Sequence, residues 1–99
     1  MTIDQLSVFV ENKAGKLAEI TAVLADEGID IRAMSIADTK DFGILRLIVN
    51  DAEKAVSALK REQYIVSVTK VIAVAISDTP GSLATVLRIL SDNAISIEY

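Results

Sequence analysis

The chain has 99 residues, of which 52 % are hydrophobic and 4 % aromatic, with 10 Lys and Arg against 14 Asp and Glu. This length suits one ordinary domain with an aliphatic core. The excess of acids argues against the basic surface that nucleic-acid binding requires. Because the sequence contains no Cys and no His, it has no disulfide, no thiolate or imidazole ligand for a metal and no histidine base.

The N-terminal residues lack the basic and apolar stretches of a signal peptide. No apolar run approaches the roughly 18 residues of a membrane span. We therefore expect a cytoplasmic protein with no nucleic-acid partner, no membrane partner, no cofactor and no bound metal.

The first part of the chain predicts a strand, a helix and a second strand. Apolar and polar residues alternate over 5–10, which is typical of a strand covered on one face. Apolar residues recur at helical spacing over 16–27, and Gly28 marks the end of that helix. The next strand is expected over 29–37, with these residues on one face: Ile29, Ile31 and Ala33.

A hairpin and a second helix follow. Residues 42–49 predict a third strand, joined to the second by the polar turn at 38–41. A helix over 52–62, capped by Asn50 or Asp51, and a strand over 65–69 complete the first unit. The order of these elements predicts an α+β, ferredoxin-like βαββαβ fold over residues 1–70, with an antiparallel sheet and both helices on one face.

The sequence then repeats itself with an offset of 66 residues and no gap. Val8, Gly15 and Leu17 correspond to Val74, Gly81 and Leu83, and the agreement extends from the helix into both flanking strands. Such an internal repeat predicts that residues 71–99 are the N-terminal half, βαβ, of a second unit. A piece of this size cannot bury its own apolar face, so we expect it to dock either on the sheet edge of the first unit or on a second copy of the chain, and we expect a dimer.

A short motif occurs at the same place in both copies, namely Asn or Asp, two residues, Gly, one residue and Leu. It is Asn12–Leu17 in the first copy and Asp78–Leu83 in the second, each followed by a helix and an Ile-x-Ile strand. This pattern resembles the ACT domain family, although Ala14 stands where proline is usual. The resemblance implies a non-enzymatic regulatory unit that binds a free amino acid near an interface between units, with an enzyme as a possible regulated partner.

The residues also give a physical reason for such a site. The first amides of a helix lack partners within the helix and carry the positive end of its dipole, so they suit a carboxylate. Side-chain oxygens at the end of the preceding strand can accept hydrogen bonds from an ammonium group. The candidate ligand-binding residues are Asn12, Lys13, Ala14, Gly15, Ile29, Asp30 and Ile31 in the first copy, and Asp78, Thr79, Pro80, Gly81, Ile95 and Ser96 in the second.

Simpler interpretations compete with this one. The two glycines could serve only a tight turn, and Asn12 and Asp78 could serve only as helix caps. Pro80 would then lie in the first turn of its helix. Phe9 and Met34 are expected on the sheet face opposite the helices, as part of a self-association surface. The alternative function is therefore a ligand-free interaction module that assembles an enzyme or an oligomer. No pair of carboxylates or activated nucleophile predicts an enzyme.

Overall fold

The computed structural model describes residues 1–38 and 41–97, so residues 39 and 40 of the predicted turn lie outside the described part. The order of elements agrees with the prediction through the first unit, and the helix predicted for the C-terminal part follows it. Their bounds are β1 Thr2–Glu11, α1 Lys16–Asp26, β2 Ile31–Asp38, β3 Phe42–Val49, α2 Ala52–Arg61, β4 Val66–Ile72 and α3 Ser82–Asp92.

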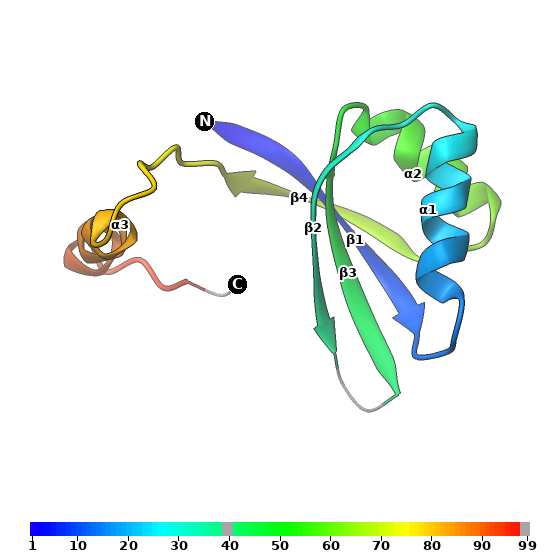
Figure 1. Ribbon diagram of the computed structural model, residues 1–99, viewed down its shortest axis with the longest axis horizontal. Coiled ribbons are helices and arrows are strands. Elements are labelled where there is room, and N and C mark those ends of the chain that lie inside the picture. Colours follow the sequence, from blue (N-terminus) through cyan, green and yellow to red (C-terminus); the bar gives the residue numbers. More distant parts are fainter. Residues whose placement is uncertain (39–40, 98–99) are drawn as a thin grey trace.

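The four strands form one antiparallel sheet in the order β2-β3-β1-β4. Helices α1 and α2 cover one face of this sheet (Figure 1), where side chains from both pack into a single core. This arrangement confirms the ferredoxin-like fold. It also explains the alternation along β1, because every second side chain points toward the helices.

The core is aliphatic and lies between the sheet and the two helices. Fully buried leucines come from both central strands and from both helices, as the composition predicts. Their side chains are those of Leu6, Leu24, Leu45, Leu47 and Leu59. Because these residues are buried in one cluster, they fix the position of α1 over β1 and β3.

Strand β2 contains an irregularity that the sequence pattern does not reveal. Ile31 pairs with Val49 and Ala33 pairs with Ile48, so Arg32 is an extra residue on β2, a β-bulge. The bulge reverses the alternation of side chains after it. The predictions that Ala33 shares a face with Ile31, and that Met34 faces away from the helices, are therefore wrong. Met34 pairs with Leu47 and Ile36 pairs with Leu45, and both leucines face the helices. Met34 and Ile36 therefore face the helices as well.

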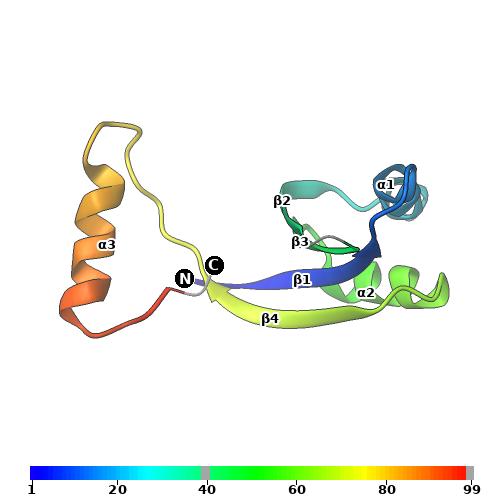
Figure 2. The same ribbon diagram turned by 90° about the horizontal axis from the view of Figure 1, so that it is seen from below.

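The C-terminal part contains the predicted helix but not its predicted strands. Residues 73–77 and 95–97 belong to neither helix nor strand. Helix α3 lies apart from the sheet, beyond the end of β4 (Figure 2), and contacts no other helix or strand of the described chain. A strand requires a neighbouring strand for its backbone hydrogen bonds, and within the described residues no strand pairs with 74–77 or 95–97.

Strand β4 itself runs across the predicted boundary between the two units at residue 70. It pairs with β1 as far as Ile72, and the N–H of Ala73 donates to the carbonyl of Met1 at 2.8 Å. The chain that leads toward α3 therefore begins as an edge strand of the first sheet.

Candidate functional site

The start of α1 is set by a glycine in the left-handed region. Gly15 has φ 85° and ψ −6°, and no side chain caps the helix. The N–H of Lys16 donates to the carbonyl of Lys13 at 3.3 Å, and that of Glu19 to the carbonyl of Gly15 at 2.9 Å. The interpretation of Asn12 as a helix cap is therefore wrong.

Two amides at this helix start remain available. The backbone N–H groups of Leu17 and Ala18 donate to no acceptor within the described residues. Both residues line a pocket of about 370 Å³ beside the loop that precedes α1. Unpaired amides at a helix N-terminus form a favourable position for an anion.

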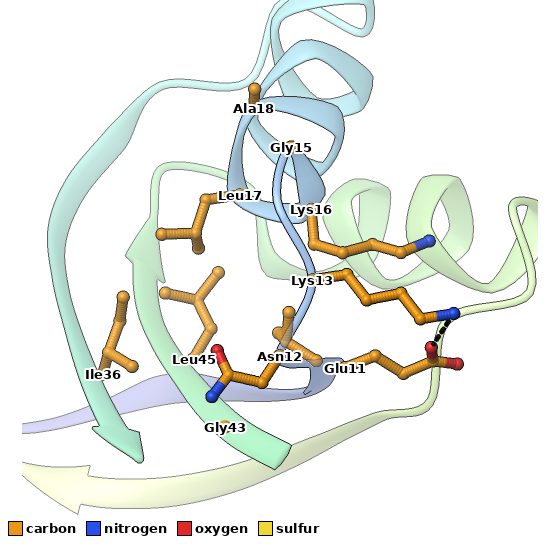
Figure 3. Close-up of a pocket in the computed structure, with 11 residues that line it drawn as sticks. Glu11, Asn12, Lys13, Gly15, Lys16, Leu17, Ala18, Ile36, Gly43 and Leu45 are labelled. Atoms are coloured by element: carbon orange, nitrogen blue, oxygen red, sulfur yellow. Dashed lines mark ion pairs between the residues drawn. The ribbon is translucent and has the colours of Figure 1, made fainter. Parts of the chain in front are cut away.

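The pocket has one apolar side and one polar side, as Figure 3 shows. The side chains of Leu17, Ile36 and Leu45 gather on the apolar side, and the Asn12 side chain extends toward Gly43 on β3. Four elements, β1, α1, β2 and β3, thus line the pocket together with the loop after β1. A pocket of this volume is within the usual range for small-molecule sites.

The charged residues at the rim are paired with one another. Lys13 lies 3.0 Å from the carboxylate of Glu11, and Lys16 lies 3.5 Å from that of Glu19. The hydrogen bond and the positive charge of Lys13 lower the pKa of the exposed Glu11 carboxyl. Glu11 is therefore ionised at neutral pH, and the pair with Lys13 points away from the apolar wall (Figure 3).

The structure brings together part of the predicted first site. Asn12, Lys13 and Gly15 line the pocket, whereas Ala14 belongs to the same loop but not to the lining. A methyl group built on Gly15 would meet no atom within 4 Å, so its positive φ, rather than a close approach of other protein atoms, explains the glycine.

The predicted second wall at residues 29–31 is not part of this pocket within one chain. Ile29 is buried in the core, and the N–H of Asp30 donates to Oδ1 of Asn50 at 2.9 Å. These residues precede or begin β2 beside the C-terminal end of α1, whereas the pocket lies at its N-terminal end. Ile36, near the other end of β2, supplies the wall instead. Sequence reasoning missed it because of the bulge.

The second copy of the motif has the same backbone geometry. Gly81 has φ 91° and ψ −14°, and no side chain caps α3. The N–H of Ser82 donates to the carbonyl of Thr79 at 3.2 Å, as Lys16 does to Lys13. Asp78 is therefore not a cap, and Pro80 precedes the helix instead of lying in its first turn. Residues 95 and 96 follow α3 and are exposed.

The ends of α1 and α3 also match. The N–H of Ile29 donates to the carbonyl of Leu24, and the N–H of Ile95 donates to the carbonyl of Leu90, both at 2.9 Å. Gly28 with φ 69° corresponds to Ala94 with φ 56°. The internal repeat found in the sequence therefore recurs in backbone geometry from the loop to the exit of the helix.

Comparison with known proteins agrees with this geometry. Residues 1–99 match the family described as ACT domain pair. The crystal structure of protein BT0572 from Bacteroides thetaiotaomicron has a TM-score of 0.96 and 48 % identity, covering 100 % of this chain and 69 % of that one. The chain belongs to the ACT domain family, whose members are regulatory modules.

Two further structures are similar over smaller parts or at lower identity. The ACT domain of prephenate dehydrogenase from Bacillus anthracis is 34 % identical, with a TM-score of 0.57, covering 64 % of this chain and 99 % of that one. The regulatory subunit of aspartate kinase from Thermus thermophilus is 17 % identical, with a TM-score of 0.69, covering 99 % of this chain and 76 % of that one. Comparison with curated proteins gave no match.

Two other structural features are absent from the described residues. No helix there is long and apolar enough to cross a membrane. Within the same residues, no group of three or more possible metal ligands comes together.

Proposed function

We propose that this chain is a non-catalytic regulatory module that binds a free amino acid in the pocket before α1. The observation that carries the proposal is the pair of unpaired amides, those of Leu17 and Ala18, on a pocket also lined by Asn12. One pocket thus offers donors for an anion and an oxygen acceptor for a cation. A free amino acid carries both charges on neighbouring atoms.

Each group of the ligand has a partner of suitable chemistry. The carboxylate accepts hydrogen bonds from the two amides and lies at the positive end of the α1 dipole. The ammonium group donates to the side-chain oxygen of Asn12, which can accept more than one hydrogen bond. Lys13 and Lys16, although paired with acids, add positive potential on the carboxylate side.

The similar structures support the partner class. One is the ACT domain of prephenate dehydrogenase and another is the regulatory subunit of aspartate kinase. We therefore propose that an enzyme, or a second copy of this chain, responds to the ligand through a change in affinity. Reciprocity requires that such a partner also changes the affinity for the amino acid.

We further propose that residues 71–99 are the N-terminal half of a second ACT-like unit. The repeated geometry at Gly81 and Ala94 supports this assignment, as does the similarity to BT0572 over the whole chain. When this unit is completed, Ile29–Ile31 or residues 95–96 of one unit can lie near the loop of another. A site between units would then include the predicted residues that one chain leaves outside the pocket.

A ligand-free interaction module is the second candidate function. It is favoured by apolar side chains that are exposed along the C-terminal part, including Val74, Leu83, Leu87 and Ile89. Under this hypothesis, replacement of Asn12 and Gly15 together would change neither the oligomeric state nor the association with a partner. Sedimentation of the doubly substituted chain measures this directly.

The test of the leading proposal is a thermal-shift screen with the twenty amino acids, followed by calorimetry. At ten times the dissociation constant, a ligand stabilises the folded chain by about 1.4 kcal/mol, which raises Tm by roughly 6–11 °C in a domain of this size. Asn12→Ala should remove the shift, while Asp78→Ala, the matched change 66 residues later, should retain it. No shift and no heat with any amino acid at millimolar concentration would refute the proposal.

A further inference from the structure

The chemistry of the pocket walls limits which amino acid fits. Beyond the groups that hold the carboxylate and the ammonium, the pocket presents aliphatic side chains from four elements. We infer that the ligand is an amino acid with an uncharged, apolar side chain, which lies against Leu17, Ile36 and Leu45. This inference rests on the proposed function and specifies its ligand class.

The apolar wall is only partly covered by the protein itself. Leu45 is fully buried, but Leu17 is 38 % exposed and Ile36 is 51 % exposed, and their side chains lie close together in Figure 3. Val10 and Ala18 extend the same surface. An aliphatic or aromatic side chain placed there removes apolar surface from water on both sides of the contact.

The wall offers nothing to a charged side chain. Among the described residues, the only acid of the pocket lining is Glu11, which is paired with Lys13 at 3.0 Å and points away from the wall, and Lys16 is paired with Glu19 at 3.5 Å. A ligand carboxylate or ammonium on the apolar side would lose its hydration without gaining a partner. The same pairing reduces the attraction that either lysine can exert on an acidic side chain.

The arrangement also separates the two recognition tasks in space. The free amides of Leu17 and Ala18 belong to the backbone of α1, and the Asn12 side chain reaches in from the end of β1, so they read the part common to all amino acids. Ile36 comes from β2 and can contact only the side chain of the ligand, which is the part that differs between amino acids. Selectivity is therefore expected to depend on Ile36 far more than on the loop.

Calorimetric titration of the unsubstituted chain with a ligand series tests the inference. Affinity should rise from L-Ala through L-Val to L-Leu, by about fourfold for each methylene that becomes buried, and L-Phe should also bind. L-Asp, L-Lys and L-Ser should bind at least tenfold more weakly than L-Leu. Equal or tighter binding of a charged or hydroxylated amino acid would overturn the inference while leaving the proposed function intact.

Two variants test whether Ile36 in the apolar wall determines which amino acid is preferred. Ile36→Asp should weaken L-Leu binding at least tenfold and make L-Lys the preferred ligand. The matched control is Met34→Asp, on the same strand and the same face but outside the pocket lining, and it should leave the ranking unchanged. If both variants or neither changed the ranking, the assignment of Ile36 would be wrong. If no amino acid bound the unsubstituted chain, the proposed function itself would fail.

Both variants should fold, because Ile36 and Met34 are about half exposed on an edge strand. Circular dichroism and the urea midpoint check this before titration. Ile36→Asn provides a neutral substitution at the same position. Like Ile36→Asp, it should weaken the binding of L-Leu, but it should create no preference for L-Lys. A preference for L-Lys in this variant would contradict the inference.

Discussion

The loops before α1 and α3 share a backbone but differ in chemistry and surroundings. The two glycines have φ values of 85° and 91°, and the hydrogen bonds that open the two helices agree within 0.1 Å, at 3.3 and 3.2 Å and at 2.9 and 3.0 Å. Around this common backbone, hydroxyl groups in the second loop replace the charged groups of the first. The corresponding pairs are Glu11 and Ser77, Lys13 and Thr79, Lys16 and Ser82, and Glu19 and Thr85.

This difference separates what the backbone requires from what the side chains add. The turn needs a residue that tolerates positive φ and a helix that begins directly after it, and both copies meet that need. In the first loop the rim is held by ion pairs, whereas in the second the hydroxyls of Ser77, Thr79 and Ser82 bond to one another at 2.6 to 3.3 Å. The helix start is therefore shared, and the chemistry of the rim is not.

The largest expected effect concerns the burial of the two helices. Leu24 of α1 is fully buried, so Leu24→Ala should lower the free energy of unfolding of the first unit by about 2–5 kcal/mol. Leu90 is its counterpart in α3, which contacts no other described element, and Leu90→Ala should change that free energy by less than about 0.5 kcal/mol. Urea titration measures both. Equal losses would mean that α3 is packed in solution.

The next effect concerns the glycines of the two loops. Gly15→Ala places a Cβ at φ 85° in otherwise open space, so only the backbone cost remains, about 1–2 kcal/mol. Gly81→Ala bears the same local cost, but it should leave the unfolding of the first unit unchanged. Gly15→Asn is the control, because asparagine tolerates the left-handed region better than alanine. If Gly15→Ala and Gly15→Asn cost the same, conformational strain would not be the cause.

A smaller effect, a gain in stability, is expected where the second copy has Ala94 at the position of Gly28. Ala94 has φ 56° at the position of Gly28, so Ala94→Gly should relieve strain and stabilise the end of α3 by about 0.5–1 kcal/mol. Hydrogen exchange of the α3 amides reports this local change. Gln63→Gly, at φ 67° after α2, should instead raise the urea midpoint of the first unit. If Gln63→Gly slowed hydrogen exchange at α3, the two substitutions would not act separately on the first unit and on α3.

The smallest effect is the response of the first loop to pH. Because Lys13 lowers the folded-state pKa of Glu11 below its ordinary value of 4.5, the pair contributes stability above that value and loses it as the pH falls through the folded pKa. Lys13→Gln should return the pKa toward its ordinary value in an NMR titration. Lys54→Gln on α2 is the control. The second loop, with Ser77 and Thr79 in place of this pair, should show no such dependence.

Much of the fold follows from local patterns. The bounds of β3 agree with the prediction at both ends, because the mainly apolar run over 42–49 is bounded by the polar residues Asp41 and Asn50. Strand β1 begins at Thr2, three residues before the predicted start, since its first residues pair with the extension of β4 to Ile72. Strand length is thus set by the partner as well as by the pattern. The same dependence explains why no strand forms around α3.

The site was predictable where the chemistry lies in a contiguous motif. Asn12, Lys13 and Gly15 come from one loop and line the pocket together. The apolar wall was not predictable, because the pairing register of β2 decides which of its residues face α1. A prediction that assumes unbroken alternation from Ile31 places Ile36 on the wrong face of the sheet.

The bulge at Arg32 also has a consequence for how such chains could diversify. Removing Arg32 would restore regular alternation and leave the later pairings unchanged, so that Met34 and Ile36 would still face the helices. A single-codon deletion at the bulge could therefore shorten β2 without exchanging any side chain of the apolar wall. Length variation at this position of the edge strand would leave selectivity unchanged, whereas substitution of Ile36 would alter it.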